Sequence, residues 1–103
     1  MNNKHLCNEI ELVRHWASTV QYSRNLVSNS LHETTDSLLI LTLPRVKRGM
    51  IVAGMAIRII VDGHEKTFSQ TMQLDTLREN NFVACDVLDA EGARDSIMEY
   101  LGL

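Results

Sequence analysis

The sequence predicts an α+β domain with a long N-terminal helix, an antiparallel sheet of three to four strands and a C-terminal helix. Three observations lead to this prediction: apolar residues at helical spacing in the first third, runs rich in Leu, Ile and Val in the middle, and a second helical stripe at the end. The chain has 103 residues, of which 45% are apolar and 22% charged, a composition typical of globular proteins. We therefore expect residues 1–103 to form one domain.

The first third is predicted to be one helix of about 25 residues. Its apolar stripe advances in steps of three or four through Leu6, Ile10, Val13, Ala17, Val20, Val27 and Leu31. No Gly or Pro interrupts residues 1–43, and the polar cluster at residues 32–36 is suited to a turn. A helix of this length would lie across a whole sheet or project toward a partner.

The central part of the chain is predicted to form the first strands. Residues 37–43 make a short apolar strand that ends at Pro44, because proline cannot donate to a sheet ladder. Residues 45–48 are expected to turn the chain, closed by Gly49, and residues 50–61 form the strongest strand. Gly54 inside that strand indicates a bulge or a point of close packing.

The remaining segments are predicted in the following order. Asp62-Gly63 is a favoured two-residue hairpin turn, and the alternating residues 64–72 predict a third, half-exposed antiparallel strand. Residues 73–81 are expected to form a short helix capped by Asp75, and residues 82–88 a fourth strand. A closing helix follows, with Asp89 as its N-cap, Gly102 after its end, and an apolar stripe at Ala93, Ile97 and Leu101.

Both faces of the predicted sheet are apolar. A sheet of this kind needs cover on both sides. The two predicted helices either lie on opposite faces or share one face, and in the second case the other face would meet another chain. The sequence leaves both arrangements open.

Motifs for chemistry are absent from the sequence. There is no CxxC, HxxxH or HExxH spacing for a metal, no G-x-S-x-G elbow, and no Lys-Ser or Lys-Thr after the glycines at 49 and 54 that would indicate a phosphate loop. Cys7 and Cys85 are expected to be reduced thiols in a cytoplasmic protein. We therefore expect no catalytic residues, no metal and no cofactor, and a protein that is not an enzyme.

The charge distribution gives the main functional hypothesis. The net charge is −3, but residues 1–60 carry seven basic against four acidic residues and residues 61–103 carry three against nine. An acidic second half favours binding of a partner protein, and a basic partner would fit it. Small bacterial or phage-encoded inhibitors, immunity-type proteins and adaptors act in this way. The residues predicted to make this surface are Asp75, Glu79, Asp86, Asp89, Glu91, Asp95 and Glu99.

The alternative hypothesis is a nucleic-acid-associated regulator. It would contact phosphates through Arg45, Lys47 and Arg48, which lie close together in the segment before the strongest strand. The acidic balance of the chain and the lack of an aromatic residue in this loop count against it. A homodimer, through the long helix or an open sheet edge, is compatible with both hypotheses. A membrane protein is not expected, because charged residues and Pro44 interrupt every long apolar run.

Overall fold

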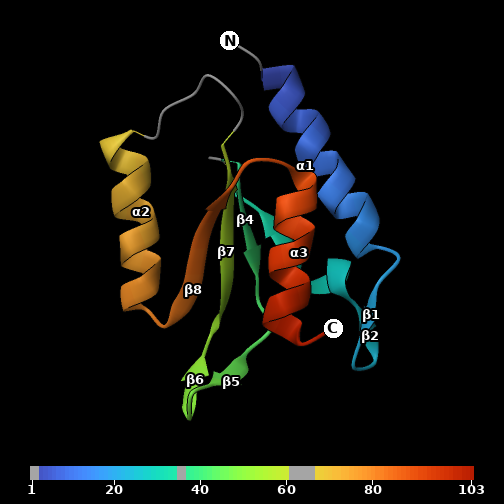
Figure 1. The fold of residues 1–103 in the computed structure, drawn as a ribbon, viewed down its shortest axis with the longest axis vertical. Coiled ribbons are helices and arrows are strands. Elements are labelled where there is room, and N and C mark those ends of the chain that lie inside the picture. Colours follow the sequence, from blue (N-terminus) through green and yellow to red (C-terminus); the bar gives the residue numbers. More distant parts are fainter. Residues whose placement is uncertain (1–2, 35–36, 61–66) are drawn as a thin grey trace.

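The computed structural model describes residues 3–34, 37–60 and 67–103 as a four-stranded sheet with helices on both faces (Figure 1). The strand order is β3-β4-β7-β8, made of Leu31–Glu33, Leu38–Leu41, Gly54–Ile59 and Phe82–Val87. The first three strands are antiparallel neighbours, whereas β8 runs parallel to β7. The predicted α+β class is confirmed, but the sheet is mixed and not wholly antiparallel.

The first helix is shorter than predicted. Helix α1 spans Asn3–Ala17, and Ile10, Val13 and Ala17 of the predicted stripe are buried on it. The hydroxyls of Ser18 and Thr19 donate to the carbonyls of His15 and Trp16, at 2.6 and 2.7 Å, which satisfies backbone groups at the end of the helix. The prediction that the helix continues to Leu31 is wrong because Ser, Thr and Asn, frequent in this segment, compete with the helical backbone for hydrogen bonds.

The segment after α1 is instead extended. Strands β1 (Gln21–Tyr22) and β2 (Asn25–Leu26) form a small hairpin, and the 3-10 turn η1 (Val27–Ser30) leads into β3. Val27 and Leu31 are buried, with exposed fractions of 0% and 7%, although neither is helical as predicted. Their spacing in the sequence therefore predicted their burial correctly but their backbone conformation wrongly.

The basic segment after Pro44 forms a two-stranded ribbon where a simple turn was expected. Strand β5 (Arg45–Lys47) pairs with β6 (Met50–Val52), joined by Arg48 and Gly49 with φ of 53° and 77°. Left-handed backbone at both turn positions matches the twist of a hairpin. The strand predicted over residues 50–61 is therefore divided into β6 and β7, and its last residue, Val61, lies outside the described residues.

Gly54, at the start of β7, is the close packing point that the sequence indicated. A Cβ atom at this position would overlap the backbone carbonyl oxygen of Leu41 on β4, and it would lie 3.0 Å from the ring of Phe82 on β8. The glycine therefore allows the neighbouring strands to approach β7 at its first residue.

A helix replaces most of the predicted third antiparallel strand over residues 64–72. Helix α2 spans Phe68–Glu79, while the predicted Asp62-Gly63 turn lies outside the described residues. Thr67, and not Asp75, is the N-cap. Its hydroxyl accepts from the amide of Gln70 at 3.0 Å, and the Gln70 side chain accepts from the amide of Thr67 at 3.0 Å. The strand prediction failed because Phe68 and Met72 are four residues apart, a spacing that fits one face of a helix as well as one face of a strand.

The C-terminal part of the chain agrees with the prediction. Helix α2 ends before Asn80, strand β8 follows, and α3 spans Ala90–Leu101. The carboxylate of Asp89 accepts from the amide of Gly92 at 2.8 Å, and Gly102 has the left-handed φ of 74° that ends a helix. Because α2 carries the chain across the sheet, β8 lies parallel to β7.

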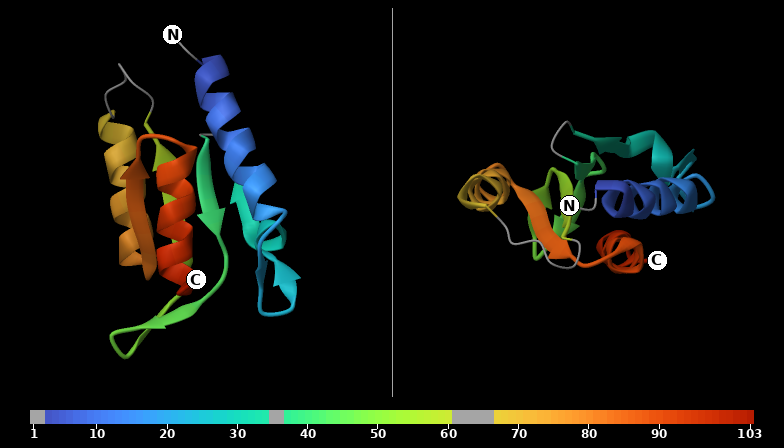
Figure 2. Two further views of the ribbon diagram at one scale, coloured as in Figure 1. Left: turned by 45° about the vertical axis from the view of Figure 1, so that its right-hand side comes forward. Right: turned by 90° about the horizontal axis from the view of Figure 1, so that it is seen from above.

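The helices cover both faces of the sheet. Helices α1 and α3 lie together on one face, and α2 lies on the other (Figure 2). The first face holds the larger core, where Ile57 and Ile59 of β7 pack with Ile97 and Leu101 of α3. On the second face Leu74 of α2 packs with Leu38 and Ala56. Helices α1 and α3 thus share one face of the sheet. For this arrangement the sequence predicted another chain on the opposite face, but α2 covers that face.

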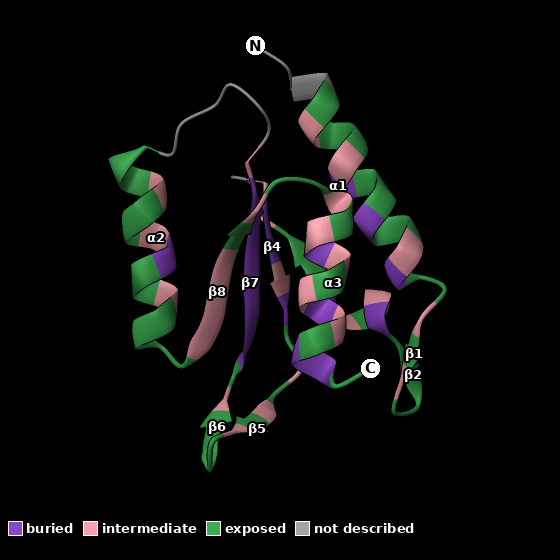
Figure 3. Ribbon diagram, in the orientation of Figure 1, coloured by how far each residue is buried: buried purple, intermediate pink, exposed green. Residues whose placement is uncertain are grey.

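Burial follows this layered arrangement. Strand β7 is buried along its whole length, whereas the hairpin β5–β6 projects from the body and is largely exposed (Figure 3). Within residues 3–34, 37–60 and 67–103, no helix is both long and apolar enough to cross a lipid bilayer.

Candidate functional site

The most buried strand of the protein contains a positive charge. All six residues of β7 are buried, and Arg58 among them is only 2% exposed. Alternation along the strand places Arg58 with Ala56 on the face that α2 covers. A guanidinium in this environment is costly unless hydrogen bonds satisfy it. Its Nη2 donates to Oε1 of Gln73 on α2, so the helix and the strand hold the cation between them.

Arg58 opens onto a polar pocket at the N-terminal end of α2. The pocket has a volume of about 440 Å³ and is lined by Arg58, Thr67, Ser69, Gln70 and Gln73. Hydroxyl, amide and guanidinium groups therefore make up its wall. Such a set can surround a small polar group and donate several hydrogen bonds to it.

The helix end adds its own electrostatic contribution to this pocket. The capping box satisfies the amides of Thr67 and Gln70, while those of Phe68 and Ser69 have no acceptor within the helix. The first turn also carries the positive end of the helix dipole. A buried cation and a helix N-terminus together favour a negatively charged ligand, and a phosphate fits this chemistry.

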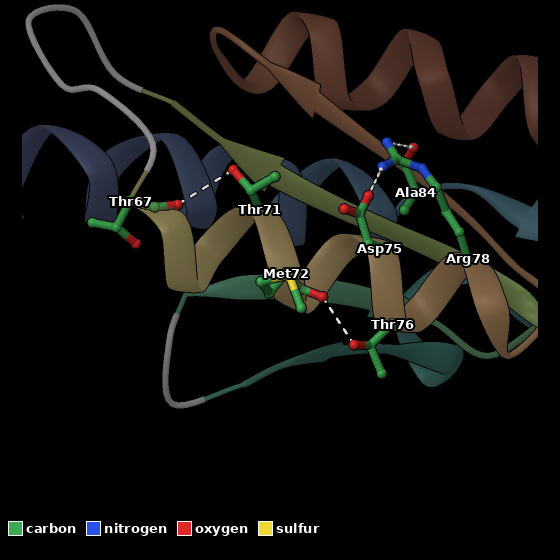
Figure 4. A network of polar contacts seen from close by, with 7 residues as sticks. All are labelled: Thr67, Thr71, Met72, Asp75, Thr76, Arg78 and Ala84. Carbon is green, nitrogen blue, oxygen red and sulfur yellow. Dashed lines mark hydrogen bonds and ion pairs between the residues drawn. The ribbon is translucent and has the colours of Figure 1, made fainter.

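Contacts with β8 fix the position of α2. Arg78 donates from Nη2 to the carbonyl of Ala84 on β8 at 2.9 Å and from Nη1 to Asp75 at 3.0 Å (Figure 4). The hydroxyl of Thr71 donates to the carbonyl of Thr67, and that of Thr76 to the carbonyl of Met72, at 3.3 and 2.9 Å. The pocket wall is thus carried by a helix that is tied to the edge strand of the sheet.

One acidic residue lies close to the pocket in the sheet. Asp86 of β8 occupies the register position beside Arg58, and paired residues of neighbouring strands point to the same face. Its side chain is exposed. A carboxylate here opposes the binding of an anion and limits the affinity of the pocket.

The seven acidic residues predicted to bind a partner are distributed over different parts of the molecule. Asp75 and Glu79 lie on α2, whereas Glu91, Asp95 and Glu99 lie on α3, across the sheet (Figure 2). Asp75 pairs with Arg78, Asp89 caps α3, and Asp86 lies on β8. The residues on α2 and those on α3 therefore lie on opposite faces of the sheet.

Two of the three predicted phosphate-binding cations turn toward the protein. Arg45 donates from Nη1 to the hydroxyl of Tyr22 at 2.6 Å and to the carbonyl of Leu101 at 2.7 Å. The Nζ atom of Lys47 lies 5.2 Å from the ring centre of Tyr100, a cation–π distance. Arg48 is exposed at the hairpin turn. Arg45 and Lys47 therefore hold the hairpin to the body of the protein.

Two other cavities are less suited to an anion. A larger one, of about 570 Å³ between α1 and α3, is lined by Glu9, Asp89 and Glu91 as well as by His15 and Arg94. Its carboxylates would repel a phosphate. A third, of about 360 Å³, is mainly apolar, and its polar and charged lining residues include both Lys47 and Glu99. Among the described residues, no three His, Cys, Asp or Glu side chains gather closely enough to hold a metal ion.

The protein is expected to lose stability above about pH 9, because the half-buried thiol of Cys85 and the buried phenol of Tyr100 must ionise there. Burial raises the pKa of the Cys85 thiol above its ordinary value, and burial likewise raises the pKa of Tyr100. The unfolded chain therefore releases these protons at a lower pH than the folded chain, so the contribution is complete below the unfolded pKa and falls as pH rises. Urea unfolding at pH 7, 9 and 10 measures this loss. A free energy of unfolding that stays constant or rises over this range would contradict the expectation.

Comparison with known proteins gives a match at the level of structure. No family model matches the chain, and no curated protein matches it significantly. A solved structure described as a "VRR_NUC domain protein" superposes on it with a TM-score of 0.77 and 16% sequence identity, over 92% of this chain and 87% of that chain. At this identity the likeness shows a shared fold.

This likeness corrects three predictions made from the sequence. A neighbour of nuclease type contradicts the non-enzymatic inhibitor or immunity-type protein, the assignment as not an enzyme, and a protein as the main partner. The error arose because the absence of known catalytic motifs was taken as evidence against an enzyme.

The residues of the pocket were not predicted from the sequence. Two signals were present: Arg58 is the one charged residue in the apolar run of residues 50–61, and Thr67 with Gln70 has the spacing of a capping box. Neither was recognised, because residues 64–72 were assigned to a strand.

Proposed function

We propose that this domain acts on nucleic acid and that the pocket at the N-terminal end of α2 binds a phosphate of the nucleic-acid backbone. The observation that carries the proposal is the buried guanidinium of Arg58, which lines a polar pocket beside a helix N-terminus. The fold, shared with a solved nuclease-type domain, supports nucleic acid as the source of that phosphate.

The physical basis is charge and geometry together. A guanidinium presents N–H donors in a planar fork that matches phosphate oxygens, and the helix amides of Phe68 and Ser69 offer further donors. Contacts of this kind position a backbone and do not read bases. We therefore expect binding with little sequence preference, and a dissociation constant of about 1–100 µM for a chain with a net charge of −3.

Nucleases with two metal ions hold them between carboxylates, whereas the described residues contain no group of three or more His, Cys, Asp or Glu side chains that could hold a metal ion. Asp62, His64 and Glu65 separate β7 from Thr67 in the sequence and lie outside the described residues. They are the side chains to substitute in a cleavage assay.

The hairpin β5–β6 is a second candidate for phosphate contact. Arg48 at its turn is exposed and available. For Arg45 and Lys47 to contribute, they would have to give up their present contacts with Tyr22, Leu101 and Tyr100. This requirement makes the hairpin the weaker of the two sites.

Fluorescence anisotropy with labelled single-stranded and duplex oligonucleotides, at 50 and 200 mM salt, tests the proposal. We expect saturable binding that weakens with salt, since each phosphate contact releases a condensed counterion. A parallel incubation with Mg²⁺ or Mn²⁺, compared with EDTA, measures strand cleavage in the protein and in its Asp62→Asn and Glu65→Gln variants. The proposal is overturned if the protein, at concentrations up to about 100 µM, shows no binding at 50 mM salt and no cleavage.

A further inference from the structure

Exposed apolar side chains gather on two elements of the described structure. Of the nine large apolar residues that are exposed in residues 3–34, 37–60 and 67–103, five lie on the hairpin β5–β6 and on α2. They are Val46, Met50, Ile51, Phe68 and Met72, with exposed fractions of 66%, 67%, 72%, 82% and 48%. Such a concentration on a small domain marks an interaction surface.

The outward face of the hairpin is apolar because its cations face inward. Val46 and Ile51 are directly paired across the ribbon and therefore lie on one face. Arg45 and Lys47 occupy the other face, where they contact Tyr22, Leu101 and Tyr100. These contacts hold the ribbon in place and leave the pair Val46–Ile51 in solvent, with Arg48 at the turn.

The outward face of α2 has the complementary composition. Phe68, Met72, Asp75 and Glu79 follow steps of four, three and four, which places them on one side of the helix, while Leu74 faces the sheet. The first half of this stripe is apolar and the second half is acidic. The acidic half lies toward the C-terminal end of α2, beyond which the hairpin projects (Figure 1).

We propose that a second copy of this chain covers these two surfaces, with the hairpin of each protomer packed on α2 of the other. Val46 and Ile51 would bury Phe68 and Met72, and Arg48 would meet the acidic half of the stripe, chiefly Glu79, because Asp75 already pairs with Arg78. In a dimer with twofold symmetry the contact between hairpin and α2 occurs twice, so neither surface is left open for a third copy. This inference does not depend on the proposed nucleic-acid function.

Sedimentation equilibrium of the whole chain tests the dimer. Wild-type protein is expected to dimerise, and Ile51→Asp to weaken the association at least about tenfold, because it places a charge in the centre of the contact. Leu88→Asp is the matched control, since Leu88 is 71% exposed against 72% for Ile51 and lies on neither surface. Circular dichroism verifies that both variants are folded.

A charge exchange tests the pairing of the two surfaces. Arg48→Glu and Glu79→Arg are each expected to weaken dimerisation, and the double variant to recover most of it, because only the pair restores attraction. The proposal is overturned if the wild-type protein is monomeric at about 100 µM. It is also overturned if Leu88→Asp weakens association as much as Ile51→Asp does, or if the double variant associates no better than the single ones.

Discussion

Arg58→Gln is expected to weaken oligonucleotide binding by about 10- to 100-fold, since a hydrogen bond to a charged group contributes about 1.5–3 kcal/mol. The guanidinium is buried and lines the proposed phosphate pocket, so its charge acts in a region of low dielectric constant. Loss of one phosphate contact also reduces the slope of log affinity against log salt by about 1. Anisotropy titrations at several salt concentrations measure both quantities.

Three further variants separate this effect from a general loss of charge. Arg48→Gln removes an equal charge from the hairpin turn and is expected to change affinity far less than Arg58→Gln. Arg58→Lys keeps the charge but not the planar fork, so it should give an intermediate affinity. Asp86→Asn removes the carboxylate beside Arg58 in the sheet and should raise affinity. If Arg48→Gln has the larger effect and Arg58→Gln a small one, the hairpin is the phosphate site and the pocket is not.

Gly54→Ala is expected to lower the free energy of unfolding by about 2–4 kcal/mol. The added Cβ would overlap the backbone carbonyl oxygen of Leu41, and a backbone atom of an inner strand cannot move aside as a flexible side chain can. Either β4 must separate from β7 or the start of β7 must bend, and both cost packing in the core. Urea denaturation of the variant and of the unaltered protein measures the difference.

Gly49→Ala is the matched control for this prediction. A Cβ at Gly49 meets no atom within 4 Å, but the residue has a φ of 77°, which side chains rarely adopt. Its expected cost is about 1–2 kcal/mol, from backbone strain alone. A larger loss of stability in Gly49→Ala than in Gly54→Ala would show that backbone conformation, and not contact between strands, is what glycine provides here.

Local patterns predicted those elements that rest on local chemistry. The strand after residue 37, strand β8, and helix α3 with its Asp89 cap all follow from apolar runs and capping residues that act over a few positions. The end of α1 at Ala17 was missed because Val27 and Leu31 reach the core from other conformations. The helical period of buried residues is therefore not proof of a helix.

The parallel strand and the candidate site could not be predicted for a related reason. Both depend on α2, and Phe68 and Met72 fit a strand and a helix equally well. Once residues 64–72 are taken as a strand, β8 has no crossover that could make it parallel, and Arg58 has no helix end beside it. The ambiguous spacing of Phe68 and Met72 therefore prevented the prediction of both the sheet topology and the candidate site.

The packing of α1 beside α3 determines when the domain can fold during its synthesis. The first helix and the last pack on the same face of the sheet, and the carboxylate of Glu9 accepts from the amide of Ala90 across 81 positions of sequence. The larger core includes Ile97 and Leu101, so it stays incomplete until α3 has left the ribosome. Contacts this distant in sequence carry a large loop-closure cost, and folding of the domain is therefore expected to follow its translation.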